Sequence, residues 1–253
     1  MSGSRFVAER VAAIGLAALA LTFSPVRANA GPVTFLDQTF DPAGWTTVPF
    51  PFGDGGQGTV AQVATSGNPG PYRSILLDIQ PAPSASTFSA LWLFNFHQSA
   101  IYDPSSQGAI ATIDYAEDSI FLGGVNDVGT RLTVANGTHA VSLALRQNGV
   151  LYIPSGFALP GASWGTFSLA GLTETNFSAV GAPGHLDFST SGALVQFGFL
   201  HRVSGSIGGI GFESTTGIDN WTVTVTPVPE PSTLLLVVGG AVGIAFLRRR
   251  REG

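Results

Sequence analysis

Three carboxylates gather in the segment "TIDYAEDS", which contains Asp114, Glu117 and Asp118. Two carboxyl groups can hydrolyse a glycosidic bond when they lie roughly 5 Å or about 6.5 to 9.5 Å apart. Carboxylate oxygens are also the ligands that calcium prefers. Because the sequence does not provide the separation, a solvated turn is the leading interpretation of this segment, calcium coordination is the second, and a hydrolase site stays an alternative.

Two glycine motifs match catalytic or nucleotide-binding patterns only as strings of letters. Gly53–Gly58 reads GDGGQG and fits G-x-G-x-x-G, but neither a helix pattern nor a βαβ unit surrounds it. Gly161–Gly165 reads GASWG and fits G-x-S-x-G, which serves a nucleophile only on the strand–turn–helix of an α/β sheet. We therefore interpret the first as a surface loop and Ser163 as a loop hydroxyl.

The histidines are spread along the chain and do not indicate a metal site. No two of them stand two or four residues apart, the spacings at which one element directs two imidazoles at one ion. We interpret each as a surface or strand-end residue: His97, His139, His185 and His201. Cysteine is absent, which excludes a cysteine nucleophile, cysteine-ligated zinc and iron–sulfur clusters, and we expect no catalytic cofactor.

Aromatic side chains are the other candidates for recognition, because flat rings stack on the C–H faces of sugars. Trp45, Tyr102 and Trp164 border loops rich in Gly, Pro and Ser, and we expect these three to be exposed and able to contact a glycan. Trp92 and Trp221 lie within apolar or alternating segments, and we expect them to fill the core.

The elements that would position these residues are strands. Apolar or alternating segments of four to nine residues, such as "YRSILLDIQ", "HAVSLALRQ" and "ALVQFGFL", are separated by Gly, Pro or Asn, while long helical patterns are missing. Asn148-Gly149 predicts a tight hairpin. The pattern predicts an all-β fold with about a dozen strands over residues 31–226, arranged as a single antiparallel β-sandwich of the jelly-roll type.

Charge excludes one class of partner for this region. Its four arginines stand against thirteen acidic residues between Asp37 and Asp219, and lysine is absent from the whole chain. So acidic a domain repels phosphate backbones, and we expect no nucleic-acid binding.

The first 30 residues have the organisation of a signal peptide. Arg5 and Arg10 precede an apolar stretch from Val11 to Phe23, and Ala28-x-Ala30 forms a small-residue cleavage site. We expect the mature chain to begin at Gly31 after export through the Sec translocon and cleavage by signal peptidase.

Residues 227–253 combine a rigid turn, a short apolar segment and a basic cluster. Ser232 to Leu247 is uncharged, and as a helix its sixteen residues would extend about 24 Å, somewhat less than a hydrocarbon core of about 30 Å. Four arginines, Arg248, Arg249, Arg250 and Arg251, would hold its end in the cytoplasm. We therefore predict a transmembrane helix at 232–247 with the preceding domain outside.

This tail closely resembles the PEP-CTERM sorting signal of Gram-negative bacteria over about 25 positions. The resemblance rests on Val228-Pro229-Glu230-Pro231-Ser232-Thr233, the short helix and the terminal arginines. It implies that exosortase, a membrane-embedded enzyme, recognises Pro229, Glu230 and Pro231 and processes the chain near them, so that the inner membrane holds the protein only transiently. The two prolines agree with this role because they keep the backbone around Glu230 extended.

The central domain also resembles jelly-roll modules of the galactose-binding-like and carbohydrate-binding type. The segments "LALRQNGVLYIP" and "ALVQFGFL" and the closing "GIDNWTVTV" carry this resemblance. It implies that Asp219 could help to hold a structural calcium ion, with Asp37 or Asp41 as partners. The alternative is a strand-end carboxylate that accepts hydrogen bonds from backbone amides.

Three classes of function follow. The leading one is a non-catalytic protein of the cell envelope or extracellular matrix, exported, processed at its tail by exosortase and retained among exopolysaccharides. The alternatives are a lectin-like module with a defined glycan and a polysaccharide hydrolase that uses Asp114 or Glu117.

Overall fold

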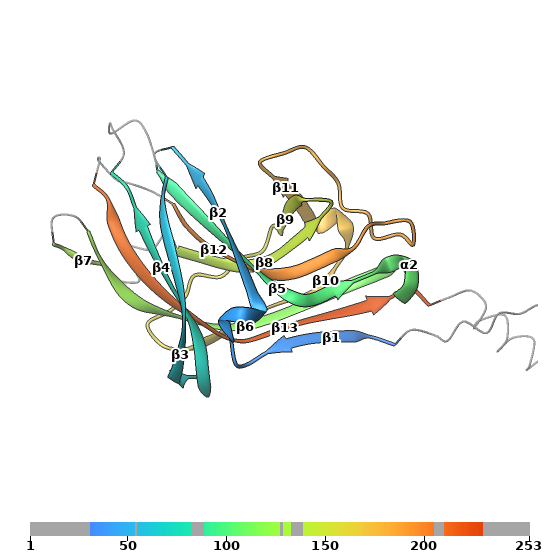
Figure 1. Cartoon of the computed structure of the whole chain (residues 1–253), viewed down its shortest axis with the longest axis horizontal. Helices are drawn as coiled ribbons and strands as arrows, with labels where there is room; N and C mark the ends of the chain where they lie inside the picture. The colour runs from blue at the N-terminus through green and yellow to red at the C-terminus, as the bar shows by residue number, and fades with distance from the viewer. Residues whose placement is uncertain are drawn as a thin grey trace, which may run out of the picture. The chain divides into compact units, whose positions relative to one another are not determined.

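The computed structural model describes residues 31–53, 55–81, 89–126, 129–132, 139–204 and 210–229 of the 253-residue chain (Figure 1). Residues Gly31–Val228 form one compact unit that contains two antiparallel sheets. The prediction of an all-β antiparallel sandwich is therefore confirmed. The jelly-roll type of the sandwich stays a prediction.

The seven-stranded sheet has the order β10-β6-β13-β4-β3, with β1 paired to β13 and β7 paired to β6. Its long central strands are β6 and β13, and β4 and β1 follow one another along the same side of β13. The strand bounds are β1 (Val33–Asp37), β3 (Gly56–Gly67), β4 (Gly70–Ile79), β6 (Ile110–Asn126), β7 (Arg131–Leu132), β10 (Gly165–Leu172) and β13 (Phe212–Pro227).

The six-stranded sheet has the order β11-β9-β8-β12-β5-β2. Its strand bounds are β2 (Trp45–Phe52), β5 (Ala90–Tyr102), β8 (His139–Gln147), β9 (Val150–Pro154), β11 (Phe177–Val180) and β12 (Val195–Ser204). Short helices occur in three of the described connections: η1 (Pro42–Gly44), α2 (Pro104–Gln107) and η3 (Glu174–Asn176).

The main core lies between the sheets and follows from the alternation of apolar residues along the strands. In β12, Val195, Phe197 and Phe199 point inward, and each is fully buried. Trp221 of β13 is also fully buried, which confirms the prediction that it fills the core. A buried aromatic side chain of this size contributes about 3 kcal/mol or more of hydrophobic stabilisation.

A second apolar cluster covers the outer face of the six-stranded sheet. It contains Phe94, Phe96 and Leu200, all buried, and partly buried side chains such as Phe50 and Trp92 pack against it. The prediction that Trp92 fills the core of the sandwich is therefore wrong, because its side chain packs, partly exposed, in this outer cluster.

The two edges of this sheet approach one another across that cluster. Gly181 follows β11 on one edge, and a Cβ atom at this position would collide with the ring of Phe50 in β2 on the other edge. The sheet is thus strongly curved around its outer cluster.

The turn between β8 and β9 confirms the hairpin prediction. Gln147 pairs with Val150, and the two turn residues both have positive φ, 53° for Asn148 and 79° for Gly149. Asn and Gly are the residue types that tolerate this conformation best.

Both ends of the compact unit leave the seven-stranded sheet at the same end. β1 runs antiparallel to β13, and Val33 pairs with Val225 (Figure 1). The backbone N–H of Val228 donates to the carbonyl of Ala109, which closes the unit just before Pro229.

Three sequence interpretations are wrong. "TIDYAEDS" is no solvated turn, because it lies within the 17-residue strand β6. His201 is neither at the surface nor at a strand end, because it occupies an inward position within β12 and is fully buried; His139 does open β8, although it is buried as well. Gly56 to Gly58 open strand β3 and do not belong to a loop.

The structure does not reach the terminal segments, so their interpretation stays a prediction. Among the described residues, no helix has the length and apolar character needed to cross a bilayer. The predicted helix at 232–247, the signal peptide with Ala28 and Ala30, and Glu230, Pro231 and Arg248 to Arg251 lie outside the described residues.

Candidate binding face of the six-stranded sheet

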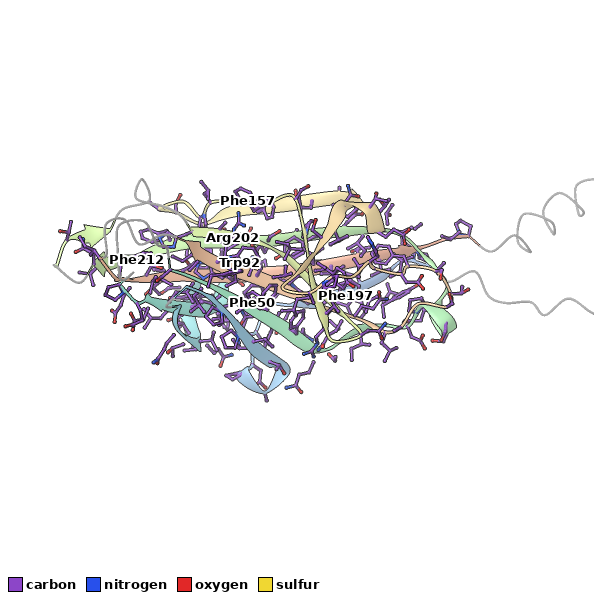
Figure 2. All side chains as sticks on the ribbon, turned by 90° about the horizontal axis from the view of Figure 1, so that it is seen from above. Phe50, Trp92, Phe157, Phe197, Arg202 and Phe212 are labelled. Atoms are coloured by element: carbon purple, nitrogen blue, oxygen red, sulfur yellow. The ribbon has the colours of Figure 1, made fainter. Side chains whose placement is uncertain are left out.

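A row of aromatic and cationic side chains crosses the outer face of the six-stranded sheet. Phe50 of β2 pairs with Trp92 of β5, and Trp92 pairs with Arg202 of β12. Phe157 extends the row because the chain after β9 runs beside β8, where Ala158 pairs with Val141. Figure 2 shows Phe157, Arg202, Trp92 and Phe50 in succession, and we call these four residues the Arg202 row.

The guanidinium group of Arg202 lies between two rings. Its Cζ atom is 5.4 Å from the ring centroid of Trp92 and 4.5 Å from that of Phe157. Both separations are within the range of attractive cation–π contacts. Phe157 is 51% exposed, while Arg202 and Trp92 are partly exposed. The row therefore combines a held cation with an accessible aromatic face.

Arg202 has no polar partner within the described part of the chain. It makes neither a hydrogen bond nor an ion pair there, although a guanidinium group carries five N–H donors. Burial lowers the pKa of Arg202, but an arginine stays charged at neutral pH. The side chain also lines a small pocket with Ser142, Ile153, Phe157 and Leu200.

The two sheets differ in charge. The six strands of the sheet that carries Arg202 contain no aspartate or glutamate, and their arginines are Arg146 and Arg202. Arg146 packs over the ring of Phe96 and donates to Gln196. The acidic strand residues all belong to the seven-stranded sheet. Among the described residues, Arg202 is thus a cation without a polar partner on a sheet whose strands contain no carboxylate.

The structure does not expose two of the three aromatic residues predicted to contact a glycan. Trp45 is 5% exposed, and its Nε1 donates to Asp37 at 2.7 Å. Tyr102 is fully buried, and its hydroxyl donates to the carbonyls of Gln107 and Gly108. The prediction of exposure was wrong because both side chains belong to the main core, where Trp45 packs against Phe199 and Trp221.

Trp164 is partly exposed, as predicted, but it lies on the other sheet. It packs edge-on against Tyr72 at 5.4 Å, and its Nε1 donates to the carbonyl of Ser66. A Cβ atom at Gly217 of β13 would lie 2.9 Å from its ring. Trp45, Tyr102 and Trp164 therefore do not form one platform.

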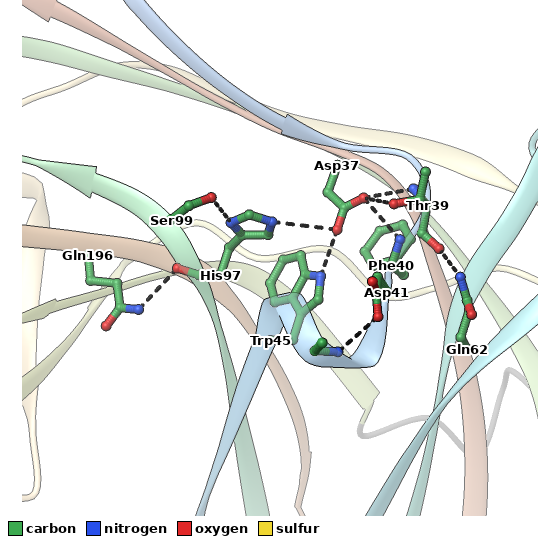
Figure 3. A network of polar contacts seen from close by, with 10 residues as sticks. Asp37, Thr39, Phe40, Asp41, Trp45, Gln62, His97, Ser99 and Gln196 are labelled. Atoms are coloured by element: carbon green, nitrogen blue, oxygen red, sulfur yellow. Dashed lines mark hydrogen bonds and ion pairs between the residues drawn. The ribbon is translucent and has the colours of Figure 1, made fainter.

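Asp37 is the acceptor at the centre of a buried network (Figure 3). Its Oδ1 accepts from the backbone N–H groups of Thr39 and Phe40 and from the hydroxyl of Thr39, and its Oδ2 accepts from Trp45. Burial raises the pKa of Asp37, but these hydrogen bonds outweigh burial and leave the pKa below its usual value. The carboxylate thus fixes the chain between β1 and β2.

The same network contains a Ser–His–Asp arrangement that is structural. His97 Nδ1 is 3.2 Å from the Ser99 hydroxyl, and His97 Nε2 is 3.7 Å from Asp37 (Figure 3). A distance of 3.7 Å is too long for a hydrogen bond, and Asp37 is already bound to Trp45. The histidine ring stacks on Trp221 instead, so it packs against the core rather than activating Ser99.

The residues predicted to bind calcium accept hydrogen bonds in this structure, and calcium binding stays a prediction. Oδ1 of Asp219 accepts from the backbone of Asn220, its Oδ2 accepts from the backbone of Asn68, and both oxygens of Asp37 are engaged as described. Asp41 caps η1 through the N–H of Ala43. In the parts of the chain that the structure describes, no group of three or more His, Asp or Glu could hold a metal ion. These carboxylates act as acceptors for N–H donors.

The acidic segment of β6 cannot act as a pair of catalytic carboxylates. Asp114 and Glu117 are three residues apart in a strand and point to opposite faces of the sheet. Asp114 is exposed, whereas Glu117 is fully buried and accepts a hydrogen bond from the hydroxyl of Tyr115. Burial raises the pKa of Glu117 to about 8.

The sequence reasoning did not identify the Arg202 row. One signal was available in the sequence: Arg202 is an outward-facing residue of an alternating strand, and that segment contains no acidic residue. Its neighbours could not be identified from the sequence, because they lie far away in the chain: Trp92 comes about 110 residues earlier, and Phe157 about 45 residues earlier in the segment after β9.

Comparisons with known proteins give one sequence match and several similarities in fold. None of the curated proteins matches this chain. One similar structure is the family 11 carbohydrate-binding module of Clostridium thermocellum, which was solved with a β-1,3-1,4-mixed-linked tetrasaccharide. Its sequence is 12% identical to this chain, and the match covers 80% of this chain and 99% of that one, with a TM-score of 0.42. The CBM22-1 xylan-binding domain of Paenibacillus barcinonensis Xyn10C is also 12% identical over 79% of this chain and 99% of that one, with a TM-score of 0.34. From such values we infer nothing about the ligands of this chain.

The sequence match concerns the segment that follows β13. Residues 227–251 match the model of the PEP-CTERM protein-sorting motif, and this segment begins at Pro227, the last residue of β13. The resemblance of the tail is thereby confirmed. The chain carries a PEP-CTERM protein-sorting motif directly after its β-sandwich.

Proposed function

We propose that this chain is an exported, non-catalytic protein of the cell envelope or extracellular matrix, sorted and processed by exosortase through residues 227–251. The match to the PEP-CTERM motif carries this proposal. The signal peptide at 1–30, the transmembrane helix at 232–247, the jelly-roll type of the sandwich and passage through the Sec translocon are parts of it.

The position of the motif supports processing without loss of the folded domain. The backbone of Val228 still bonds to Ala109, and the Pro-Glu-Pro segment begins at the next residue. A cut near Pro229 or Pro231 would therefore leave every strand in place. Two prolines also keep Glu230 out of regular helix and sheet pairing, which leaves the segment accessible to an enzyme.

The test is the intact mass of the protein from its native host, with and without active exosortase. We expect a species from near Gly31 to near Glu230 only when exosortase is active. Glu230→Gln should retain the tail, whereas the same change at the ectodomain residue Glu174 should not affect processing. A protein that keeps Arg248 to Arg251 in both hosts would show that the tail is a lasting anchor and would refute the proposal.

Glycan binding is a second candidate function of the sandwich, and the Arg202 row is the observation that favours it. The row offers an exposed aromatic ring beside a cation whose N–H groups donate to no described residue. Hydrolysis is disfavoured because Asp114 and Glu117 point to opposite faces of β6. Saturable binding of a purified polysaccharide by the exported protein, without release of products, is the expected result.

A further inference from the structure

The Arg202 row contains a positive charge that the described protein does not neutralise. Two rings hold the guanidinium group, yet none of its N–H groups donates to a described residue. An arginine that packing holds in place loses little further conformational freedom when it binds an anion. The side chain is thus preorganised for a partner that the described domain does not supply.

The acidic character of the whole domain does not cancel this charge locally. No strand of the six-stranded sheet contains an acidic residue, and the acidic strand residues belong to the opposite sheet, about 10 Å away across the core. Within the described residues, no carboxylate forms an ion pair with Arg202.

The chemistry of the row indicates the class of its ligand. Guanidinium presents a planar fork of N–H donors that matches the two oxygens of a carboxylate. Phe157 lies 4.5 Å from that fork and exposes 51% of its surface, which suits the apolar C–H face of a sugar ring. A neutral sugar would use the ring but leave the charge unpaired.

We propose that the Arg202 row binds the hexuronate units of an acidic polysaccharide, with Arg202 holding the carboxylate and Phe157 stacking on the sugar ring. This inference rests on the glycan-binding candidate function and is independent of the sorting of the tail. Trp92 positions the guanidinium group from the side opposite Phe157.

The site is accessible in a protein held by its C-terminal segment. Val195 of β12 pairs with Tyr102, at the end of the sandwich from which the chain leaves after Val228. Arg202 lies seven residues further along β12, about 23 Å from that end. The row is thus remote from the point where the tail leaves the domain.

The first experiment compares two ligands with one protein. We would measure binding of the exported protein to polygalacturonate and to the fully methyl-esterified form of the same polymer. Esterification keeps the sugar ring and removes the negative charge, so we expect binding at least about tenfold weaker to the ester. Equal binding of both polymers, or no saturable binding of polygalacturonate, would overturn the proposal.

Variants then locate the site. Arg202→Gln should weaken binding of polygalacturonate about ten- to hundredfold, and Arg202→Lys should restore only part of it because an ammonium group lacks the planar fork. Phe157→Ala should also weaken binding, and this exposed residue can be changed without opening the core. The matched control is Arg146→Gln, which removes the same charge from the same sheet and should bind as the unmodified protein does.

Equal losses in Arg202→Gln and Arg146→Gln would indicate unspecific attraction to a basic surface and would refute the assignment. Near-UV circular dichroism of each variant identifies changes that disturb the fold. Because the ligand comparison needs no variant, a misfolded Arg202→Gln protein leaves the proposal testable. The intact-mass experiment on the tail has a separate outcome, so failure of the saccharide site is distinguishable from failure of the sorting proposal.

Discussion

Two histidines buried in the core should make this domain sensitive to acid. His201 is fully buried, and neither ring nitrogen has a hydrogen-bond partner in the described structure. His139 lies next to it, with ring centroids 6.3 Å apart, and contacts the hydroxyl of Ser214. Burial lowers the pKa of His139 to about 4, and burial together with the charge of protonated His139 lowers the pKa of His201 to about 3.

The sign of the effect follows from proton binding in the two states. An unfolded histidine titrates near 6.5, so between pH 6.5 and about pH 3 the unfolded chain binds more protons than the folded chain. The folded domain therefore has its full stability above pH 6.5, where the imidazoles are neutral in both states, and loses stability as the pH falls below this value. At pH 5 the loss amounts to about 2 kcal/mol for each histidine, and two such losses are a large part of the stability of a typical domain.

The perturbation that isolates this effect is His201→Leu, compared with the unmodified protein by urea unfolding at pH 7.5 and pH 5. Leucine fills the site without a titrating group. Between pH 7.5 and pH 5, the free energy of unfolding of the variant should therefore fall by about 2 kcal/mol less than that of the unmodified protein. Glu117 titrates in both proteins, and its contribution cancels in the comparison. His185→Gln, which changes an exposed histidine, is the matched control for loss of an imidazole outside the core. Equal losses in His201→Leu and the unmodified protein would refute the reasoning.

Three further changes test other parts of the structure. Burial raises the pKa of Glu117 in the folded state to about 8, so the unmodified domain loses stability as the pH rises from 4.5 through 8. Above pH 8, Glu117→Gln should therefore raise the free energy of unfolding by at least about 1 kcal/mol, as measured by chemical denaturation. Gly181→Ala should lower the free energy of unfolding by about 1 kcal/mol more than Gly171→Ala does, as measured by thermal unfolding. Both glycines have positive φ, but only at Gly181 would the new methyl group collide with the ring of Phe50. Asp37→Ala should lower the free energy of unfolding by about 2 kcal/mol or more, because it leaves the buried indole N–H of Trp45 and two backbone N–H groups without their acceptor. A decrease of less than about 0.5 kcal/mol would contradict this role of Asp37.

Local features of the fold could be predicted because they depend on neighbours in the chain. Alternation of apolar residues indicated the strands, and Asn148-Gly149 indicated a hairpin that needs two residues with positive φ. The PEP-CTERM motif is a linear signal, and residues 227–251 match it without any reference to the sandwich.

Burial could not be predicted where it depends on strand register and on the path of loops. Trp45 and Tyr102 border polar loops, yet both rings belong to the core cluster between the sheets. The sequence predicts a surface or strand-end position for His201, which is in fact fully buried, because a one-residue difference in register decides whether a strand residue faces the core or the solvent.

The sequence by itself determined that this chain forms an antiparallel β fold and carries a sorting motif, because alternation, turn chemistry and a linear motif are encoded within short segments. Only the tertiary structure decided which side chains meet. Phe50, Trp92, Arg202 and Phe157 come from separate parts of the chain and form one row through the order and register of their strands. The same strand order gathered the acidic strand residues on the other sheet, since such long-range pairing depends on how the whole core packs.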